Sequence, residues 1–361
     1  MDTLGIWYEP IETGPEKTTG SGKLNEVKTD IHINLWKLQT NQIRSSRSNL
    51  KLSRYDRKFD HFLDLGLMIS DISEINRICI FLPFSIQINE IIDLGNAFHQ
   101  DANLVSAIFN ADLRATSSGT KILEVENLES HYKFNIYSLD TAQQIKIEEY
   151  KDIGVVIYIN LAQIVHKRTE AHYFRIRIKS ENVRNFSRIY KPRNSFFESA
   201  FQNTEVIDFR INERRNLDKS ILERIDSCVL PKINKINFFL LRNEKDDYVL
   251  SHKPSDNCRG LEKGLWRIYL GDNYMQDDIL AYHWKEKDTD SFRLLIKMKF
   301  EKNNVETIVK YILVIAGLSI LFNVSASGIY DGIKCMYVSY KNCDLVSRIS
   351  ATSTVKDESK K

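Results

Sequence analysis

Hydrophobic and polar residues alternate along much of the chain in short segments, and this two-residue period predicts β-strands. Strands are predicted at 31–38, 77–84, 106–113, 133–139, 154–161, 173–179, 204–212 and 233–241. Two further strands, at 279–287 and 292–300, are separated by the turn residues DTDS, which predicts a hairpin. Helical periodicity is confined to 88–98, 194–202 and 217–225, the last with Asn216 as its expected N-cap.

Strands outnumber helices and do not alternate with them regularly. This order favours an α+β fold, a β-rich soluble domain with a mixed or antiparallel sheet, for which a sandwich-like core is one arrangement. We assign residues 1–30 to a polar N-terminal segment and 31–304 to the β-rich domain, with a sub-boundary near residue 195 at the loop KPRN. The GSGK of the N-terminal segment lacks the spacing and the following Ser or Thr of a phosphate-binding loop.

The longest apolar segment lies near the end of the chain, at YILVIAGLSILFNVSASGIY, residues 311–330. It contains no charged residue, and a helix needs roughly 20 mostly apolar residues to cross about 30 Å of hydrocarbon. Its terminal tyrosines suit the membrane interface. A buried core helix is the alternative, and Asn323 near its middle fits that reading. The absence of a polar face of ordinary width favours one transmembrane helix at 305–330, followed by a short polar tail at 331–361.

The charges on either side of this segment predict its orientation. More basic residues precede it than follow it within equal spans, which places the N-terminal side in the cytoplasm. The expected protein is therefore a single-pass membrane protein with a cytoplasmic N-terminal domain. The N-terminus shows no signal peptide, and the five cysteines form no CxxC pair, in agreement with a reducing compartment.

Small and polar side chains of the predicted membrane helix share one side. At about 100° per residue, Ala316, Ser319, Asn323 and Ser327 fall within one arc. Such residues allow helices to approach closely and to hydrogen-bond across the contact. We expect self-association into a homo-oligomer through 311–330, with these residues at the helix interface or lining a pore. The alternative is that they are common membrane-helix residues with no special role.

The most basic part of the chain is 166–194, with nine Lys or Arg against two Glu. Alternation in the strand 173–179 places four polar side chains on one face, and further cations and aromatics follow. Guanidinium groups suit phosphate, and interleaved aromatics suit bases. We therefore predict a nucleotide- or oligonucleotide-like ligand; the alternative is a solvated face that pairs with acids on a neighbouring strand. The predicted ligand-binding residues are Tyr173, Arg175, Arg177, Lys179, Arg184, Arg188, Lys191 and Arg193.

No pattern of residues indicates an active site. Two groups of residues match a nuclease metal site only in part: Asp112 with Glu124 and Glu126, and the E-x-K at Glu149. Such partial matches are expected by chance among 48 acidic residues. The histidines show no metal-ligand spacing, and no nucleophile motif is present. We expect no catalytic residue, no metal and no cofactor, and we favour a protein that is not an enzyme.

These features together predict a membrane-anchored sensor–effector. Its cytoplasmic domain binds an anionic ligand, and its helix, in contact with membrane lipid, oligomerises and carries the output, as an ion channel in the most specific version. The layout is shared with bacterial antiviral-defence effectors, which is an analogy of architecture alone. Two alternatives remain: a tail-anchored binding or scaffold protein without a pore, and a metal-dependent nuclease acting through the basic region. Neither the ligand nor an operon-encoded partner is identified by the sequence.

Overall fold

The computed structural model describes residues 3–11, 27–39, 59–119, 121–162, 164, 169–190, 202–271, 274, 278–301 and 305–354. The chain divides into two compact units, residues 1–303 and residues 304–361. The first is a β-rich domain with three sheets, and the second is a long helix, so that the predicted α+β, β-rich fold is confirmed. The expected sub-boundary near residue 195 and the helix at 194–202 lie outside the described residues, apart from Gln202.

The largest sheet has ten strands and is mixed, in the order β16-β17-β14-β2-β3-β11-β8-β7-β6, with β5 paired to β11. Its parallel pairs are β14 with β2 and β11 with β8, and its other pairs are antiparallel. Its strands are β2 (Lys28–Gln39), β3 (Phe59–Ile69), β5 (Ile91–Asp93), β6 (Leu113–Ser117), β7 (Ile122–Asn127), β8 (Lys133–Tyr137), β11 (Ala171–Lys179), β14 (Lys232–Asn243), β16 (Asn257–Gly260) and β17 (Ile279–Thr289).

Two smaller antiparallel sheets have four strands each. The first has the order β1-β4-β10-β9, with β1 (Gly5–Pro10), β4 (Ile75–Leu82), β9 (Ile145–Tyr150) and β10 (Gly154–Asn160). The second has the order β12-β13-β18-β15, with β12 (Ser187–Tyr190), β13 (Gln202–Ile211), β15 (Asp247–Ser251) and β18 (Phe292–Glu301). The short helices are η1 (Ile88–Glu90), α1 (Gly95–Gln100), α2 (Ala102–Phe109), α3 (Thr141–Gln144), η2 (Glu181–Phe186), η3 (Arg214–Asn216), α5 (Lys219–Asp226) and α6 (Lys263–Leu270).

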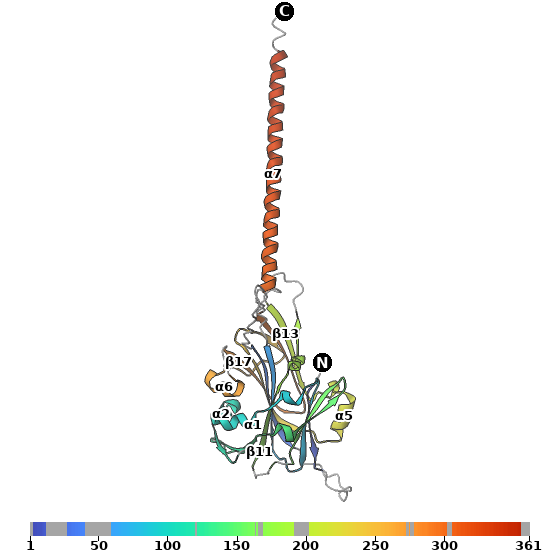
Figure 1. Cartoon of the computed structure of the whole chain (residues 1–361), viewed down its shortest axis with the longest axis vertical. Helices are drawn as coiled ribbons and strands as arrows, with labels where there is room; N and C mark the ends of the chain where they lie inside the picture. Colours follow the sequence, from blue (N-terminus) through green and yellow to red (C-terminus); the bar gives the residue numbers. More distant parts are fainter. Residues whose placement is uncertain are drawn as a thin grey trace, which may run out of the picture. The chain divides into compact units, whose positions relative to one another are not determined.

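The two faces of the ten-stranded sheet have different surroundings. Along β2, Ile31, Ile33 and Leu35 enter the main apolar core, which also contains side chains from both four-stranded sheets. The alternate residues of the strands, among them His32 and Trp36, belong to the opposite face, which α1, α2 and α6 cover. In Figure 1, α2 and α6 lie on one flank of the domain and α5 on the other. The ten-stranded sheet thus has one apolar face, which packs in the main core, and one partly polar face, which the helices cover.

Most of the predicted strands are present, and the exceptions have identifiable causes. Residues 106–113 were expected to be a strand, but the first four of them belong to α2, which Asp101 caps and which is followed by Asn110 in a left-handed conformation. The expected hairpin does not form, because β17 joins the ten-stranded sheet and β18 pairs with β13 in another. In α5 the cap is Asp218 and not Asn216.

Two other segments also differ from expectation. Residues 88–98 were predicted as one helix, but they divide into η1, β5 and the start of α1. The N-terminal segment contains β1, in which Trp7 and its neighbours Ile6 and Tyr8 are buried on both faces. A strand buried on both faces shows little alternation between hydrophobic and polar residues, and this explains why the pattern did not reveal it.

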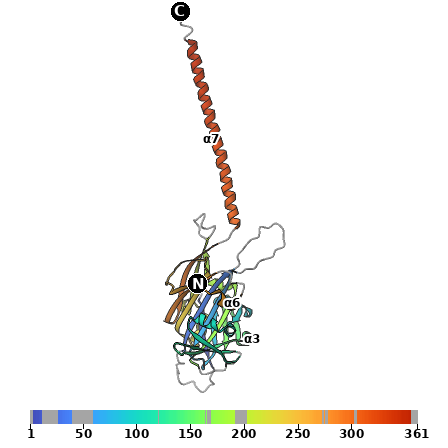
Figure 2. The ribbon, with the colours of Figure 1, turned by 90° about the vertical axis from the view of Figure 1, so that its left-hand side faces the viewer.

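The second unit is a single helix, α7 (Val305–Thr354), which is continuous in both views (Figures 1 and 2). Its segment Tyr311–Asn342 is long and apolar enough to cross a membrane by length and composition, and none of its most apolar part is buried against the rest of the chain. The helix continues through residues 331–354, where a short polar tail was expected.

Candidate anion-binding pocket

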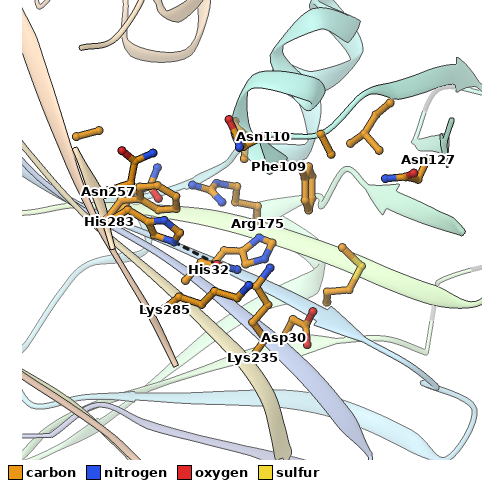
Figure 3. Close-up of a pocket in the computed structure, with 18 of the residues that line it drawn as sticks. Asp30, His32, Phe109, Asn110, Asn127, Arg175, Lys235, Asn257, His283 and Lys285 are labelled. Atoms are coloured by element: carbon orange, nitrogen blue, oxygen red, sulfur yellow. Dashed lines mark hydrogen bonds between the residues drawn. The ribbon is translucent and has the colours of Figure 1, made fainter. Parts of the chain in front are cut away.

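A row of polar side chains crosses five strands on the partly polar face of the ten-stranded sheet. In the strand register, Lys285 of β17 lies opposite Asn237 of β14, and Asn237 lies opposite His32 of β2. His32 in turn lies opposite Gly66 of β3, and Gly66 opposite Arg175 of β11. Because side chains at paired positions project from the same face, these residues form a common floor. Figure 3 shows His32, Arg175 and Lys285 over these strands.

Gly66 makes room for the arginine at the end of this row. A Cβ atom at this position would come within 2.2 Å of the Tyr173 hydroxyl and 3.1 Å of Arg175 Nη1. Arg175 is 1% exposed, and it donates from Nη1 to the Tyr173 hydroxyl at 2.7 Å and from Nε to the Tyr269 hydroxyl at 2.8 Å. The missing side chain therefore lets the guanidinium and the phenol occupy the space over β3.

A buried carboxylate supports the arginines from behind the pocket. Asp64, fully buried, accepts hydrogen bonds from Arg177 Nε at 2.6 Å and from Trp36 Nε1 at 2.8 Å. The Tyr269 hydroxyl of α6 donates to it at 2.7 Å. Burial alone raises the pKa of Asp64, but the charge and hydrogen bonds of Arg177 lower it below its usual range, so the group is ionised. This network fixes β2, β3, β11 and α6 together.

The pocket has a volume of about 420 Å³, within the range of small-molecule sites. Its walls come from β16, from the end of α2 and from the segment between β6 and β8, and Figure 3 shows Phe109 and Asn110 at the end of α2 above the floor. The lining residues are Asp30, His32, Asn34, Met68, Ile108, Phe109, Asn110, Ala111, Leu113, Asn127, Tyr132, Phe134, Arg175, Lys235, Asn237, Phe239, Asn257, Arg259, Ala281, His283 and Lys285.

Positive charge dominates the lining. The pocket is lined by four cationic residues, Lys235, Lys285, Arg259 and Arg175, whereas Asp30 is the one carboxylate among the described lining residues. The ammonium groups of Lys235 and Lys285 have no ion pair with any described residue. Burial and the nearby charge of Lys285 lower the pKa of Lys235. Asp30 lies opposite Lys235 and partly offsets this effect, so that the carboxylate faces an excess of positive charge in the pocket.

Two histidines of the pocket are held neutral. Burial lowers the pKa of His32 well below its usual range, and its Nδ1 lies 3.2 Å from the Tyr173 hydroxyl. Burial also lowers the pKa of His283, whose ring stacks on Phe239 at 4.3 Å between centroids. His283 Nε2 donates to Asn237 Oδ1 at 3.2 Å. At neutral pH these rings contribute hydrogen bonds and flat surfaces, while the lysines and arginines carry the charge.

The structure separates the predicted ligand-binding residues into several environments. Tyr173, Arg175, Arg177 and Lys179 do share one face of β11, but α6 covers much of it, and only Arg175 among them lines the pocket. Lys179 lies at the edge, 3.9 Å from Asp60. The next two predicted cations are exposed on other elements, Arg184 on η2 and Arg188 on β12. Lys191 and Arg193 lie outside the described residues.

Most of the pocket cations come from strands that the basic region does not include. Lys235 lies in β14, Lys285 in β17 and Arg259 in β16. The sequence carries a weaker signal for them: in HIN of β2, NKIN of β14 and YHWK of β17, polar residues occupy alternate positions of strands that are otherwise apolar. Their convergence depends on strand order, and no local pattern contains that information.

The predicted interface residues of the membrane helix lie on α7. Ala316, Ser319, Asn323 and Ser327 are all exposed in the single chain, in the part of α7 whose side chains the structure describes. Ser319 Oγ donates to the Ile315 carbonyl at 2.9 Å, so that its hydrogen bond is satisfied within the helix. Asn323 makes no hydrogen bond through its carboxamide with the described part of the chain, and this group differs in that respect from Ser319.

Two further observations concern metals and relatives. Across the described ranges of the chain, no cluster of three or more His, Cys, Asp or Glu side chains is arranged to hold a metal ion. No model of a known protein family matches the chain, and no curated protein sequence is significantly similar to it.

Proposed function

We propose that the protein is a membrane-anchored receptor whose β-rich domain binds a phosphate-bearing anion and whose α7 carries the output at the membrane. The observation that supports the ligand is the pair of ammonium groups of Lys235 and Lys285 in a pocket with one carboxylate. Like charges that share a partly buried site repel each other, and a bound anion relieves that repulsion. Binding of the anion therefore stabilises the folded domain.

The membrane part of the proposal rests on α7. Its apolar segment of 32 residues has a length of about 48 Å at 1.5 Å per residue, more than the roughly 30 Å of hydrocarbon in a bilayer. We place the β-rich domain on the cytoplasmic side, because more cations precede residues 311–330 than follow them. The preceding cations are Arg293, Lys297, Lys299, Lys302 and Lys310, and the following ones are Lys334, Lys341 and Arg348.

The output is proposed to be self-association of α7 through Ala316, Ser319, Asn323 and Ser327. A carboxamide without a partner is unfavourable in hydrocarbon, and a second helix provides one. β18 ends at Glu301 and α7 begins at Val305, so a change in the domain is transmitted through a short connection. Ion flux through a pore formed by α7 would depend on Asn323, whereas a simple membrane anchor would not need this residue.

The experiment reconstitutes the full-length protein in liposomes and measures ion flux with and without pyrophosphate, ATP or short oligonucleotides. We expect flux that depends on one of these anions and that disappears in Asn323→Leu, with Phe322→Leu as the neighbouring control. The double variant Lys235→Met/Lys285→Met should abolish the response to the anion. A matched control is Lys146→Met, which removes an exposed cation on β9, away from the pocket.

The outcomes separate the alternatives. Anion binding without flux in any preparation would favour the anchored scaffold protein over the pore. Absence of binding for every anion, with the membrane helix intact, would contradict the receptor proposal. Cleavage of the oligonucleotide in the presence of a divalent metal would instead favour the nuclease.

A further inference from the structure

The volume of the pocket suits a small ligand. Its volume of about 420 Å³ lies within the range for one small molecule. A strand of nucleic acid, by contrast, is bound along a groove that follows several phosphates. Resting on the proposed function, we propose that the ligand is a nucleotide of one or two units, with phosphate at Lys235 and Lys285 and base against Phe109 and Tyr132.

The phosphate end is defined by neighbouring strands. Asn237 of β14 lies opposite Lys285 of β17, and Lys235 is the next residue of β14 on the same face, so that the two lysines are diagonal neighbours. Asp30, across from Lys235 on β2, accepts a hydrogen bond from Asn234 Nδ2 at 2.7 Å, which occupies part of the carboxylate. Arg259 lines the same pocket and is anchored by its donation to the Ala107 carbonyl at 3.1 Å. Several cations around one carboxylate suit more than a single negative charge.

The base end is defined by aromatic rings. Phe109, at the end of α2, contacts His32, Tyr173 and Phe134, with centroids 5.2 Å, 4.9 Å and 5.1 Å away. These contacts hold the ring in place, and it still lines the cavity. Tyr132 is 39% exposed beside Phe134 and lines the same wall. Rigid aromatic surfaces in a basic pocket match the flat face of a nucleobase, which an inorganic anion does not have.

Two asparagines supply directed hydrogen bonds. Asn127 Oδ1 accepts from the backbone N–H groups of Glu129 and Ser130, at 3.0 Å and 2.8 Å. Asn257 Oδ1 accepts from the N–H of Cys258 at 2.8 Å. Because the carbonyl of each carboxamide is occupied, the NH₂ group remains to donate, and both residues line the pocket. A base or ribose offers acceptors for these donors at the periphery of the cavity.

The test compares ligands that share a phosphate and differ in the base. Calorimetry on the full-length protein in nanodiscs would use pyrophosphate, ribose 5-phosphate, the four nucleoside monophosphates, ATP and a ten-nucleotide RNA. We expect at least one nucleotide to bind about ten-fold or more tightly than ribose 5-phosphate, because stacking on an aromatic ring adds affinity of that order. Tyr132→Ala should remove most of this advantage, whereas Tyr190→Ala, an exposed tyrosine on β12, should leave it unchanged.

Each result decides between the two proposals. If ribose 5-phosphate and pyrophosphate bind as tightly as every nucleotide, the receptor for an anion stands and the nucleotide inference is overturned. If the RNA binds more tightly than any mononucleotide and Tyr132→Ala has no effect, the inferred size is wrong. If none of these compounds binds, both proposals fall. Tyr132 is partly exposed, so its substitution leaves the core intact and a loss of affinity is not a loss of folding.

Discussion

Gly66 lies at the centre of the pocket floor, between His32 of β2 and Arg175 of β11. Among the five residues of this row, Gly66 alone has no side chain, and the Tyr173 hydroxyl of the neighbouring strand β11 fills the space that a side chain would take. The hydroxyl of Tyr173, directed over it, joins His32 to Arg175. A single residue without a side chain thus decides where the buried guanidinium lies.

Gly66→Ala is expected to lower the free energy of unfolding by about 1–3 kcal/mol, the usual range for an overpacked core. The added methyl group would displace the rigid ring of Tyr173, whose Cζ lies within 2.8 Å of the new Cβ position. Urea unfolding of the full-length protein in detergent, followed by tryptophan fluorescence, measures the change. Gly260→Ala on β16 is the matched control, because no atom lies within 4 Å of the added Cβ. Equal stability of the two variants would contradict this reading of the pocket floor.

At the scale of elements, a buried ion cluster joins three strands from two sheets. Glu205 of β13 accepts a hydrogen bond from Lys37 Nζ of β2 at 2.7 Å and lies 3.4 Å from Arg242 Nη2 of β14. Burial raises the pKa of Glu205, but the charges of Arg242 and Lys37 outweigh this effect and lower it from 4.5 to about 2. The carboxylate is therefore ionised in the folded protein throughout the neutral and mildly acidic range.

The depressed pKa predicts how stability depends on pH. The contribution of Glu205 is complete above pH 4.5, its ordinary pKa, and is lost as pH falls towards about 2. Glu205→Gln should destabilise the protein by roughly 3 kcal/mol at pH 7, and the difference from the unaltered protein should shrink below pH 4.5. Urea unfolding at several pH values measures this difference.

Glu286→Gln serves as the comparison, since Glu286 pairs with Lys253 and its side chain is 28% exposed, against 2% for Glu205. An ion pair of that kind contributes about 1 kcal/mol or less. A pH-independent difference for Glu205→Gln would show that its charge is not what joins the strands.

Short apolar or alternating segments predicted most of the strands, including β10, which is buried along almost its whole length. The alternation in 173–179 correctly gave β11 and the residues that share its face, but it did not show that α6 would bury that face. Residues 106–113 alternate like a strand, yet the Asp101 cap and the left-handed Asn110 define a helix there. The residues DTDS do connect β17 and β18, but the two strands pair with other strands, because long-range packing decides strand pairing. For the same reason Lys235 and Lys285 could not be brought together from sequence alone.

The whole molecule combines a domain with its own apolar cores and a helix whose apolar side chains are exposed in the single chain. If α7 crosses the membrane, the full-length protein should remain in the membrane fraction after a carbonate wash. Leu318→Arg/Leu321→Arg should release it, because each charge at the centre of a membrane helix costs about 2.5–3.5 kcal/mol.

The control for this experiment is Asn342→Arg, which places one of the same charges at the end of the apolar segment, where it reaches the interface. That variant should stay with the membrane. Release of the unaltered protein by carbonate would show that the segment does not span the bilayer, whatever its length and composition.

The position of β18 in its sheet has a mechanical consequence. β18 lies between β13 and β15 and is paired with β13 along its whole length, from Phe292 to Glu301, immediately before α7. The hydrogen bonds of an antiparallel pair run across the strands. Tension applied through α7 along β18 would therefore load many of these bonds at once and not one after another. In a pulling experiment that loads β18 along its length, the domain should therefore unfold at a higher force than a domain joined through an edge strand.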